Sequence, residues 1–404
     1  LKSFKKNMEY SKQLKKLGTE TAFAVSAQAK AWAEKGNKVY PFHLGDFNLL
    51  TPDKIIEATL KAIRDGKTGY CPSEGIFPLR EALANDVGAK RSVSYEPDNV
   101  SVQPGGKPTI GKFIASVMNP GDQVLYPNPG YPIYESQIEY QGGLAIPYHY
   151  VPRANGFDID IDHLKASINN KTVAIIYNNY QNPISAESTI EEMEAIAEIA
   201  IENDLWVLSD DAYYEIIYDG KARSIVSIPG MKERTVILYT FSKKFAMTGW
   251  RIGGAIGPKE IIKHISKLNV NAESCTTHFI QDAMVEALNG DQTGPQNLLK
   301  TLKERRNATV NGLNAINGLE VSLPRSTFYI FPNVNHIMKS KGMTNVEELQ
   351  LGALENANVS FCTRDHFGRP NKDETDYYIR FAYSGINEND INEGMAKLKK
   401  YFES

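Results

Sequence analysis

Seven short runs rich in β-branched and aromatic residues alternate with segments of helical character through the middle of this 404-residue chain. Such an alternation is typical of a mostly parallel sheet, because parallel neighbours need a crossover connection, usually a helix. We therefore predict an α/β fold whose mostly parallel, seven-stranded sheet is covered by helices on both faces. The predicted strands are NVSVQ from Asn99, DQVLY from Asp122, GLAIPY from Gly143, TVAIIYN from Thr172, LWVLSD from Leu205, TVILYT from Thr235 and RIGGAIG from Arg251.

The pattern changes toward the C-terminus. From about residue 291 a long polar helix is followed by mixed strands and helices, which predicts a smaller α+β domain. No low-complexity tract or Pro/Gly-rich linker separates the parts, so we expect them to share an interface. We predict an N-terminal arm that joins the small domain over residues 1–45, a large domain over residues 46–290 and the rest of the small domain over residues 291–404.

Composition and charge limit the classes of partner. The chain is 42% hydrophobic and 23% charged, values that are ordinary for a globular enzyme. Its net charge of -3 provides no basic field that would attract nucleic acid or an anionic membrane. No apolar run is long enough to span a bilayer. We therefore expect small-molecule partners, with no nucleic acid and no membrane.

Cysteine usage and the N-terminal arm bear on the compartment. Cys71, Cys275 and Cys362 are too few and too scattered for a disulfide framework or a zinc site, which favours a reducing, cytoplasmic location. The arm contains six lysines but no apolar core of a signal peptide. We expect it to rest, solvated, on a partner subunit; binding to nucleic acid is the alternative. The seven histidines offer no metal pairing, so we expect them to be structural and predict no metal.

The stretch TFSKKFAMTGWR, residues 240–251, directly follows an apolar run. It places the hydroxyl of Thr240 three residues before Lys243, and Arg251 eight residues after it. A buried strand that ends in such a turn would bring the three groups together. The amine can form a Schiff base with an aldehyde, and the other two groups can hold a phosphate, so we predict pyridoxal 5′-phosphate as cofactor. A helix start with solvated Lys243 and Lys244 is the alternative.

This spacing of Ser/Thr, Lys and Arg resembles the signature of the fold-type I aminotransferases, in the aspartate aminotransferase family. The resemblance covers residues 21–402 and includes the order of every motif described below. It implies an enzyme that moves an amino group between an L-amino acid and a 2-oxo acid. It also implies that Lys243 carries the cofactor as a Schiff base and serves as the catalytic base.

Further motifs follow the ends of other predicted strands, where an open α/β sheet binds its ligand. PGGKPT suits a turn into a helix N-terminus, where the amides of Gly106 and Lys107 can donate to a phosphate; a plain loop is the alternative. The resemblance implies that Tyr131 stacks on the cofactor ring and that Asn182 donates to its 3′-oxygen. A packed tyrosine is the alternative for Tyr131. The Thr-Gly that completes the family's Asn-Pro-Thr-Gly motif is replaced by Ile-Ser.

The segment DDAYY carries two overlapping pairs of aspartate and tyrosine. Spacing alone allows Asp210 with Tyr213 or Asp211 with Tyr214, and an acidic helix cap is a third possibility. The family pattern is Asp-x-Ala-Tyr, and only the first pair has Ala212 directly before its tyrosine. The resemblance therefore implies that Asp210 pairs with the cofactor's ring nitrogen and that Tyr213 bonds its 3′-oxygen.

Three further residues complete the predicted site. Arg380 stands alone in the apolar run YYIRFAY, and a buried arginine implies an anionic partner. The resemblance makes that partner the substrate α-carboxylate; a structural salt bridge is the alternative. It also implies that Gly45 and Asn182 adjoin the substrate. In the family, the tyrosine that matches Tyr70 reaches the cofactor phosphate of the other subunit in a homodimer; packing within its own loop is the alternative.

Other activities share these residues. The fold also supports lyases of the C–S β-lyase type and decarboxylases, which are the main alternative function. Some transcription regulators use this domain as a sensor, but the roughly 20 residues before the resemblance begins are too few for a winged helix. The substrate is open: Lys107 matches a lysine that meets a distal carboxylate in some members, which points to acidic amino acids, whereas an exposed first-turn lysine is the alternative.

Overall fold

The computed structural model describes residues 8–18, 21–154 and 156–404. Three lysines of the N-terminal arm, Lys2, Lys5 and Lys6, lie outside the described residues. Residues 8–18 are exposed and include a short 3-10 helix, η1 (Lys12–Lys16). The arm returns to the body of the protein at Gly18, whose N–H donates to the Ser136 hydroxyl at 2.9 Å.

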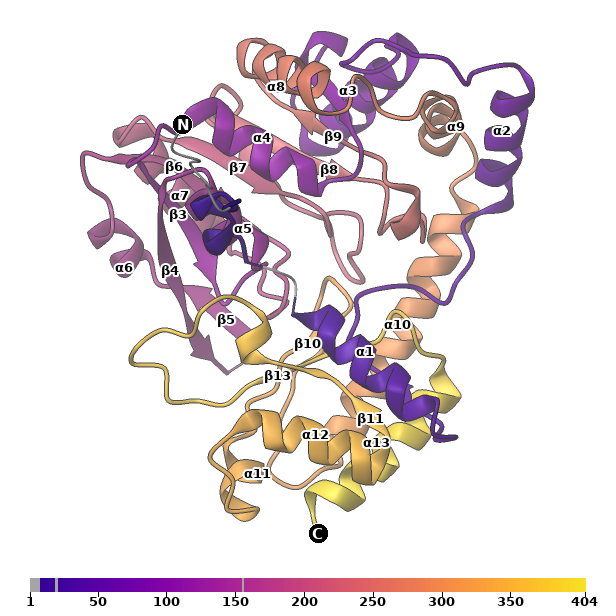
Figure 1. The fold of residues 1–404 in the computed structure, drawn as a ribbon, viewed down its shortest axis with the longest axis vertical. Coiled ribbons are helices and arrows are strands. Elements are labelled where there is room, and N and C mark those ends of the chain that lie inside the picture. Colours follow the sequence, from indigo (N-terminus) through magenta and orange to yellow (C-terminus); the bar gives the residue numbers. More distant parts are fainter. Residues whose placement is uncertain (1–7, 19–20, 155) are drawn as a thin grey trace, which may run out of the picture.

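A large sheet lies at the centre of the fold (Figure 1). Its strands are β2 (Val100–Gln103), β3 (Gln123–Asn128), β4 (Leu144–Arg153), β5 (Gly156–Ile159), β6 (Thr172–Tyr177), β7 (Trp206–Asp210), β8 (Thr235–Thr240) and β9 (Gly253–Ile256).

The strand order is β2-β9-β8-β7-β6-β3-β4-β5. Neighbours from β8 to β4 are parallel, whereas β9 is antiparallel to both β8 and β2. All seven predicted strands are present, and the mostly parallel α/β architecture is confirmed. The predicted number of strands is one too few, because β5 pairs antiparallel with β4 at the edge. β5 is four residues long and mostly half-buried, so it lacks a clear apolar pattern.

Helices cover both faces of this sheet (Figure 1). Side chains that alternate along each strand enter two hydrophobic clusters, one on each face, as strand geometry requires. The first cluster, packed on α3 (Phe77–Arg91), α7 (Ile190–Glu202) and α9 (His278–Asn289), includes Leu125, Ile175, Val207 and Ile237. The second, packed on α4 (Lys107–Val117), α5 (Ile133–Tyr140) and α8 (Lys259–Ala272), includes Val124, Ala174, Leu208 and Val236.

The C-terminal part forms a smaller α+β lobe with the N-terminal segment. β1 (Tyr40–Pro41) pairs in parallel with β11 (Val359–Ser360), and Tyr40 and Phe42 are buried in the lobe's cluster. β13 (Ile379–Ala382) lies between β10 (Tyr329–Ile330) and β12 (Cys362–Thr363). The lobe's helices are α1 (Ala22–Ala33), α10 (Thr293–Asn314), α11 (Asn335–Ser340), α12 (Val346–Ala357) and α13 (Glu388–Phe402). The domain boundaries near residues 45 and 290 stay predictions.

The remaining elements are short or peripheral. They are α2 (Asp53–Arg64), α6 (Ile161–Ala166), η2 (Pro97–Asn99), η3 (Ile225–Ser227), η4 (Thr248–Trp250) and η5 (Arg364–His366). Within the part of the chain that the structure describes, no helix is long and apolar enough to cross a membrane.

Strand direction determines where polar side chains gather. β9 is antiparallel to both β2 and β8, so β2, β3, β6, β7 and β8 all point toward the same edge of the sheet. The segment that enters β9 begins at that edge as well. The loops after five strands and before a sixth therefore converge, at the position where open α/β sheets bind ligands.

Candidate active site

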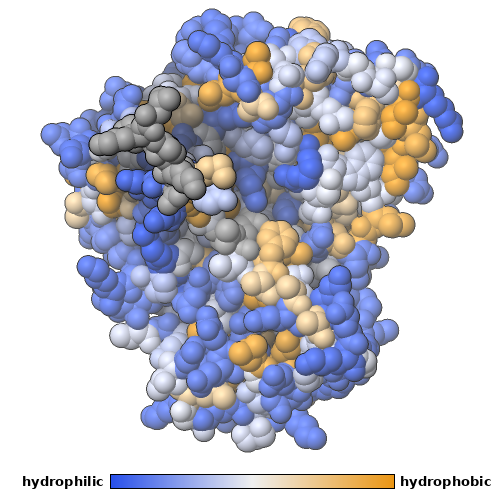
Figure 2. Space-filling model, in the orientation of Figure 1, coloured by the Kyte–Doolittle hydropathy of each residue, from blue (hydrophilic) through white to orange (hydrophobic). Residues whose placement is uncertain are grey.

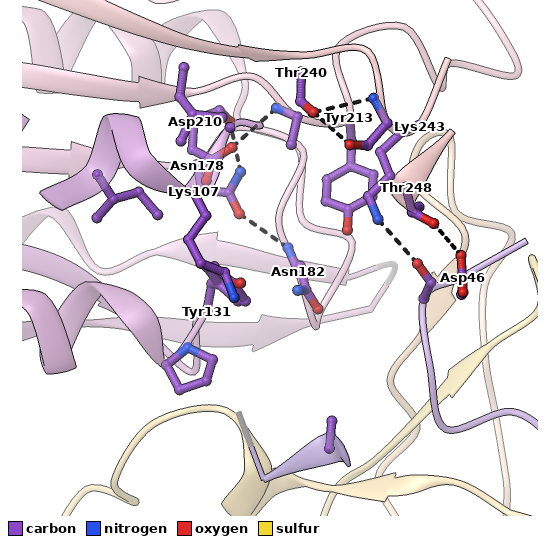
Figure 3. A pocket seen from close by; sticks show the side chains of 18 of the residues that line it. Asp46, Lys107, Tyr131, Asn178, Asn182, Asp210, Tyr213, Thr240, Lys243 and Thr248 are labelled. Atoms are coloured by element: carbon purple, nitrogen blue, oxygen red, sulfur yellow. Dashed lines mark hydrogen bonds between the residues drawn. The ribbon is translucent and has the colours of Figure 1, made fainter. Parts of the chain in front are cut away.

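A cavity of about 600 Å³ lies at this edge of the sheet and extends to the small lobe. Figure 3 shows side chains from several elements converging on it. Among the described residues, no cluster of His, Cys, Asp or Glu could hold a metal ion. Of the predicted site residues, Tyr70 alone is outside the lining. The others all line the cavity: Gly45, Gly106, Lys107, Tyr131, Asn182, Asp210, Tyr213, Thr240, Lys243, Arg251 and Arg380.

Lys243 stands in the turn after β8, with its amine inside the cavity. Its Nζ donates to the carbonyl oxygen of Gly45 at 3.1 Å and lies 5.6 Å from the ring centre of Phe328. The next side chain, Lys244, is buried elsewhere, and its Nζ lies 3.9 Å from the Glu215 carboxylate. The turn thus separates the two lysines, and the amine available in the cavity is that of Lys243.

Asp210, the last residue of β7, is a buried carboxylate at the inner end of the cavity. One oxygen accepts from the Tyr134 hydroxyl at 2.6 Å, and the other accepts from the Ala212 N–H at 3.1 Å. Burial raises its pKa from 3.8 to about 6, although these two donors and the charge of Lys243 act in the opposite direction. A carboxylate whose pKa stays raised despite two donors would gain from a further cationic N–H.

The neighbouring Asp211 is held on the opposite side of β7. Its Oδ2 accepts from Arg91 Nε at 3.0 Å and from Arg91 Nη2 at 2.8 Å, and its Oδ1 accepts from the Ser209 hydroxyl. The Tyr214 hydroxyl also faces away and donates to the Lys90 carbonyl. Asp210 and Tyr213, not Asp211 and Tyr214, therefore line the cavity.

One wall of the cavity is built for close approach to an anion. α4 begins there, and no side chain caps its N-terminus at Gly106. Gly105 has a φ of +99°, and a Cβ at this position would lie 2.1 Å from Arg251 Nη2, so only glycine fits. The Thr240 hydroxyl accepts from the Ser242 N–H at 3.2 Å and is also on this wall. A guanidinium, a hydroxyl and a helix N-terminus thus meet, as phosphate groups require.

Tyr131 forms another wall, in the loop after β3 (Figure 3). Its ring packs edge-on against Tyr134, with centroids 5.7 Å apart, and the Lys107 ammonium lies 5.7 Å from the Tyr131 ring centre. Opposite, the Tyr213 hydroxyl is 2.6 Å from that of Tyr329. The space between these walls suits a flat ring.

Arg380 reaches the cavity from β13 of the small lobe. Its Nη1 donates to Asn182 Oδ1 and its Nη2 to the His43 carbonyl, both at 2.8 Å. The rings of Tyr329 and Phe367 each lie 4.4 Å from the guanidinium. Arg380 forms no salt bridge with any carboxylate of the described residues, and its buried Nε has no hydrogen-bond partner. The structural salt bridge considered from the sequence is absent there, which leaves the charge available for an external anion.

Some lining residues were missed by sequence reasoning. Tyr134 stands one helical turn after Tyr131, so its proximity was accessible from spacing; its contact with Asp210 was not. His366, which we expected to be structural like the other histidines, lines the cavity. It comes from a turn whose sequence shows no recognisable pattern.

Comparisons with known proteins agree with this geometry. The family model for aminotransferase class I and II matches residues 37–398. The chain is 33% identical over 384 residues to a probable aspartate/prephenate aminotransferase of Aquifex aeolicus, which covers 94% of this chain and 95% of that one. It is 32% identical over 377 residues to an asparagine–oxo-acid transaminase of Streptococcus mutans, which covers 93% and 94%.

Solved structures give the same result for the fold. The aspartate aminotransferase of Thermus thermophilus with maleate superposes with a TM-score of 0.89 at 27% identity, covering 98% of this chain and 100% of that one. The aspartate aminotransferase of Rhizobium meliloti has a TM-score of 0.90 at 27% identity, covering 98% and 99%. The chain therefore belongs to the class I and II aminotransferase family and is an aminotransferase.

Proposed function

We propose that the protein uses pyridoxal 5′-phosphate to move an amino group between an acidic L-amino acid, or its amide, and a 2-oxo acid. The observation that carries this proposal is the meeting of three groups in one cavity: the Lys243 amine, the buried Asp210 carboxylate, and the anion wall around Arg251. The few, unpaired cysteines support a cytoplasmic location.

The residues present fit this cofactor part by part. The Lys243 amine suits its aldehyde, and Asp210, whose pKa is raised by burial, suits a protonated ring nitrogen. Arg251, Thr240 and the first amides of α4 suit its phosphate. Tyr131 would stack on the ring, and Asn182 and Tyr213 would bond its 3′-oxygen. Bound there, pyridoxal phosphate supplies an aldehyde that condenses with amines and a ring that withdraws electrons from the substrate Cα.

The chain's own residues then divide the work. Arg380 binds the substrate α-carboxylate. The rings of Tyr329 and Phe367, each 4.4 Å from its guanidinium, pack against this group. The Gly45 carbonyl orients the amine of Lys243, which takes the proton from the substrate Cα. Proton transfer by a positioned group of this kind contributes a factor of roughly 10²–10⁴ in rate. Asp210 keeps the ring nitrogen of the bound cofactor protonated. The buried walls exclude water from the reacting atoms.

A substrate screen tests the overall function. The cofactor's absorbance band is followed while single amino acids are added without any 2-oxo acid, and the product of each is identified by mass spectrometry. Aspartate, glutamate and asparagine should discharge the band fastest and leave the matching 2-oxo acid, because Lys107 and the named relatives point to such side chains. Release of a β-substituent, with the band unchanged, would point instead to a lyase.

Replacing the catalytic lysine provides a second test. In Lys243→Ala, turnover should fall by about 10⁴ or more, because both the covalent attachment and the proton carrier are lost. The variant should still bind the cofactor without a covalent bond, through the ring and phosphate contacts. Borohydride reduction followed by peptide mapping shows where the cofactor is attached.

Lys244→Ala is the matched control. It removes a buried charge near Glu215, so we expect lower stability but an intact covalent link. If Lys244→Ala and not Lys243→Ala abolishes attachment, the assignment of the catalytic lysine is wrong.

The buried carboxylate predicts a pH dependence of stability. The folded-state pKa of Asp210 is about 6, against 3.8 in the unfolded chain. The protonated group therefore stabilises the folded protein most below pH 3.8, and this stabilisation is lost as the pH rises through about 6. A shift of about two pKa units corresponds to about 3 kcal/mol. Relative to Asp210→Asn, the wild-type protein without cofactor should therefore lose about 2 kcal/mol of unfolding free energy between pH 4 and 6, measured by denaturant titration.

Asp211→Asn supplies the contrast. Because it leaves the buried Arg91 without its carboxylate, it should destabilise the protein near neutral pH, where Asp210→Asn does not. Asp210→Asn should also lose most of the activity when loaded with cofactor. A pH-independent difference between wild type and Asp210→Asn would contradict the raised pKa.

We further propose a homodimer whose active sites are shared. Tyr70, in the loop between α2 and α3, is 89% exposed and lies outside the cavity of its own chain. Leu60 and Ile63 of α2 and Phe77 of α3 are exposed near that loop, and Figure 2 shows apolar side chains gathered over α2. Exposed apolar patches of this kind mark protein–protein contacts. In the dimer, Tyr70 would bond the cofactor phosphate of the partner subunit.

Mixed subunits test this arrangement. Tyr70→Ala and Lys243→Ala are combined under conditions of subunit exchange, so that a hybrid dimer has one site with both residues intact. That site should regain wild-type cofactor affinity and turnover, while the parent variants stay weak. Hybrids that mass spectrometry detects but that are no more active than the parents would return Tyr70 to its own subunit.

A further inference from the structure

The turn that carries His366 is rigidly held beside the cavity. It is η5, between β12 and β13, and the buried Arg364 anchors it. Arg364 pairs with the Glu374 carboxylate at 2.6 Å and donates to Asn128 Oδ1 at 2.9 Å. The Phe367 carbonyl accepts from the Gly130 N–H at 3.0 Å, which ties this turn to the loop of Tyr131. The half-buried imidazole of His366 therefore has a fixed place in the lining.

Contacts at Nδ1 determine which ring nitrogen of His366 carries hydrogen. The Thr363 N–H donates to Nδ1 at 3.2 Å, and the Thr363 hydroxyl lies 2.9 Å away. The Thr363 carbonyl is also within 3.3 Å and would suit the opposite tautomer. A backbone N–H can only donate, however, so Nδ1 is the acceptor and the hydrogen of the neutral ring is on Nε2.

The charge state of the ring follows from its surroundings. Burial, and secondarily the positive charge of Arg380, lower the pKa of His366 below its ordinary value, although the Thr363 carbonyl and the charges of Asp365 and Glu347 act in the opposite direction. At neutral pH the neutral ring therefore predominates, and it carries one N–H donor, at Nε2, in the cavity lining.

The rest of the lining shows which part of a substrate this donor can meet. The sheet edge takes the cofactor, Arg380 takes the α-carboxylate, and the reacting Cα must adjoin Lys243. The substrate side chain is then left with the outer lining. The lining side chains that take no part in these contacts include those of Ala22, Phe23, Lys107, Pro132 and His366.

Among these five side chains, those of Lys107 and His366 can donate a hydrogen bond, and the hydroxyl of Thr248, which also lines the cavity, already donates to Asp46. We infer that His366 is a specificity-determining residue whose Nε2–H donates to an oxygen of the substrate's distal carboxylate or carboxamide. The inference rests on the proposed function. A neutral N–H can donate to an amide oxygen as well as to a carboxylate oxygen, so the site should serve both acidic amino acids and their amides. An apolar side chain would leave the donor without a partner, which is costly when it is buried.

Two substitutions separate this role from the role of His366 in the turn. In His366→Asn the shorter amide can keep an acceptor near the place of Nδ1, and so preserve the turn, but it has no N–H near the place of Nε2. His366→Gln has the reverse property, because its longer amide reaches the place of Nε2. The two variants therefore form a matched pair.

Binding is measured first, on the cofactor-loaded protein, by calorimetry with succinate and with butyrate. The two ligands share one carboxylate and differ in the distal one. We expect His366→Asn to weaken the binding of succinate about tenfold more than the binding of butyrate, because a hydrogen bond to a charged group is lost. His366→Gln should recover most of that difference. The ratio of kcat/KM for aspartate to that for alanine should change in parallel.

Three outcomes would overturn the inference. The first is an equal loss of affinity for both ligands in His366→Asn, as expected if the ring only supports Phe367 against Arg380. The second is no loss of affinity for either ligand, and the third is no recovery of succinate affinity in His366→Gln. The binding measurement does not depend on turnover. Failure of the aminotransferase proposal would appear separately, as an absorbance band that no amino acid discharges.

Discussion

The parallel hydrogen-bond ladder from β8 to β4 is the constraint on which the rest of the structure depends. Because β3, β6, β7 and β8 run in one direction and are covered on both faces, their side chains are mostly apolar. The charged groups of the cavity lie where these strands end. The Lys243 turn, Asp210, and the loop of Asn182 occupy such ends. The parallel arrangement that buries the apolar side chains of the sheet therefore also places these polar groups at one edge.

Two charged groups of the cavity, Asp210 and Arg380, would gain from a further partner. Asp210 keeps a raised pKa, and Arg380 Nε is buried without a partner. The neighbouring buried pair of Arg91 and Asp211, by contrast, is satisfied internally. This difference between two adjacent aspartates is consistent with a cavity arranged for a ligand. A ligand at 100 times its Kd would return about 2.7 kcal/mol to the folded state.

The sequence was sufficient for elements whose signal is local or periodic. The seven strands follow from their apolar runs, and the family pattern selects Asp210 over Asp211. Strand geometry explains that choice, because adjacent residues face opposite sides of β7: Asp210 meets Tyr134 of α5, and Asp211 meets Arg91 of α3. Which side holds the cavity depends on the layers, which no local pattern specifies. His366 is the extreme case, since β12 and β13 place it beside Arg380 through the pairing of Cys362 with Arg380.

The pairing of β1 with β11 has a consequence for how the chain is made. Tyr40 pairs with Val359, so the N-terminal segment is synthesised more than 300 residues before its partner strand. At the usual 5–20 residues per second, translation of the intervening chain takes roughly 15–60 s. Through that time Tyr40 and Phe42, which end up fully buried in the small lobe, lack the strands that cover them, β11 beside Tyr40 and β13 with Phe381 beside Phe42. The ribosome-bound chain thus carries two large aromatic rings exposed to solvent, or to a chaperone, until the last tenth of the sequence is made.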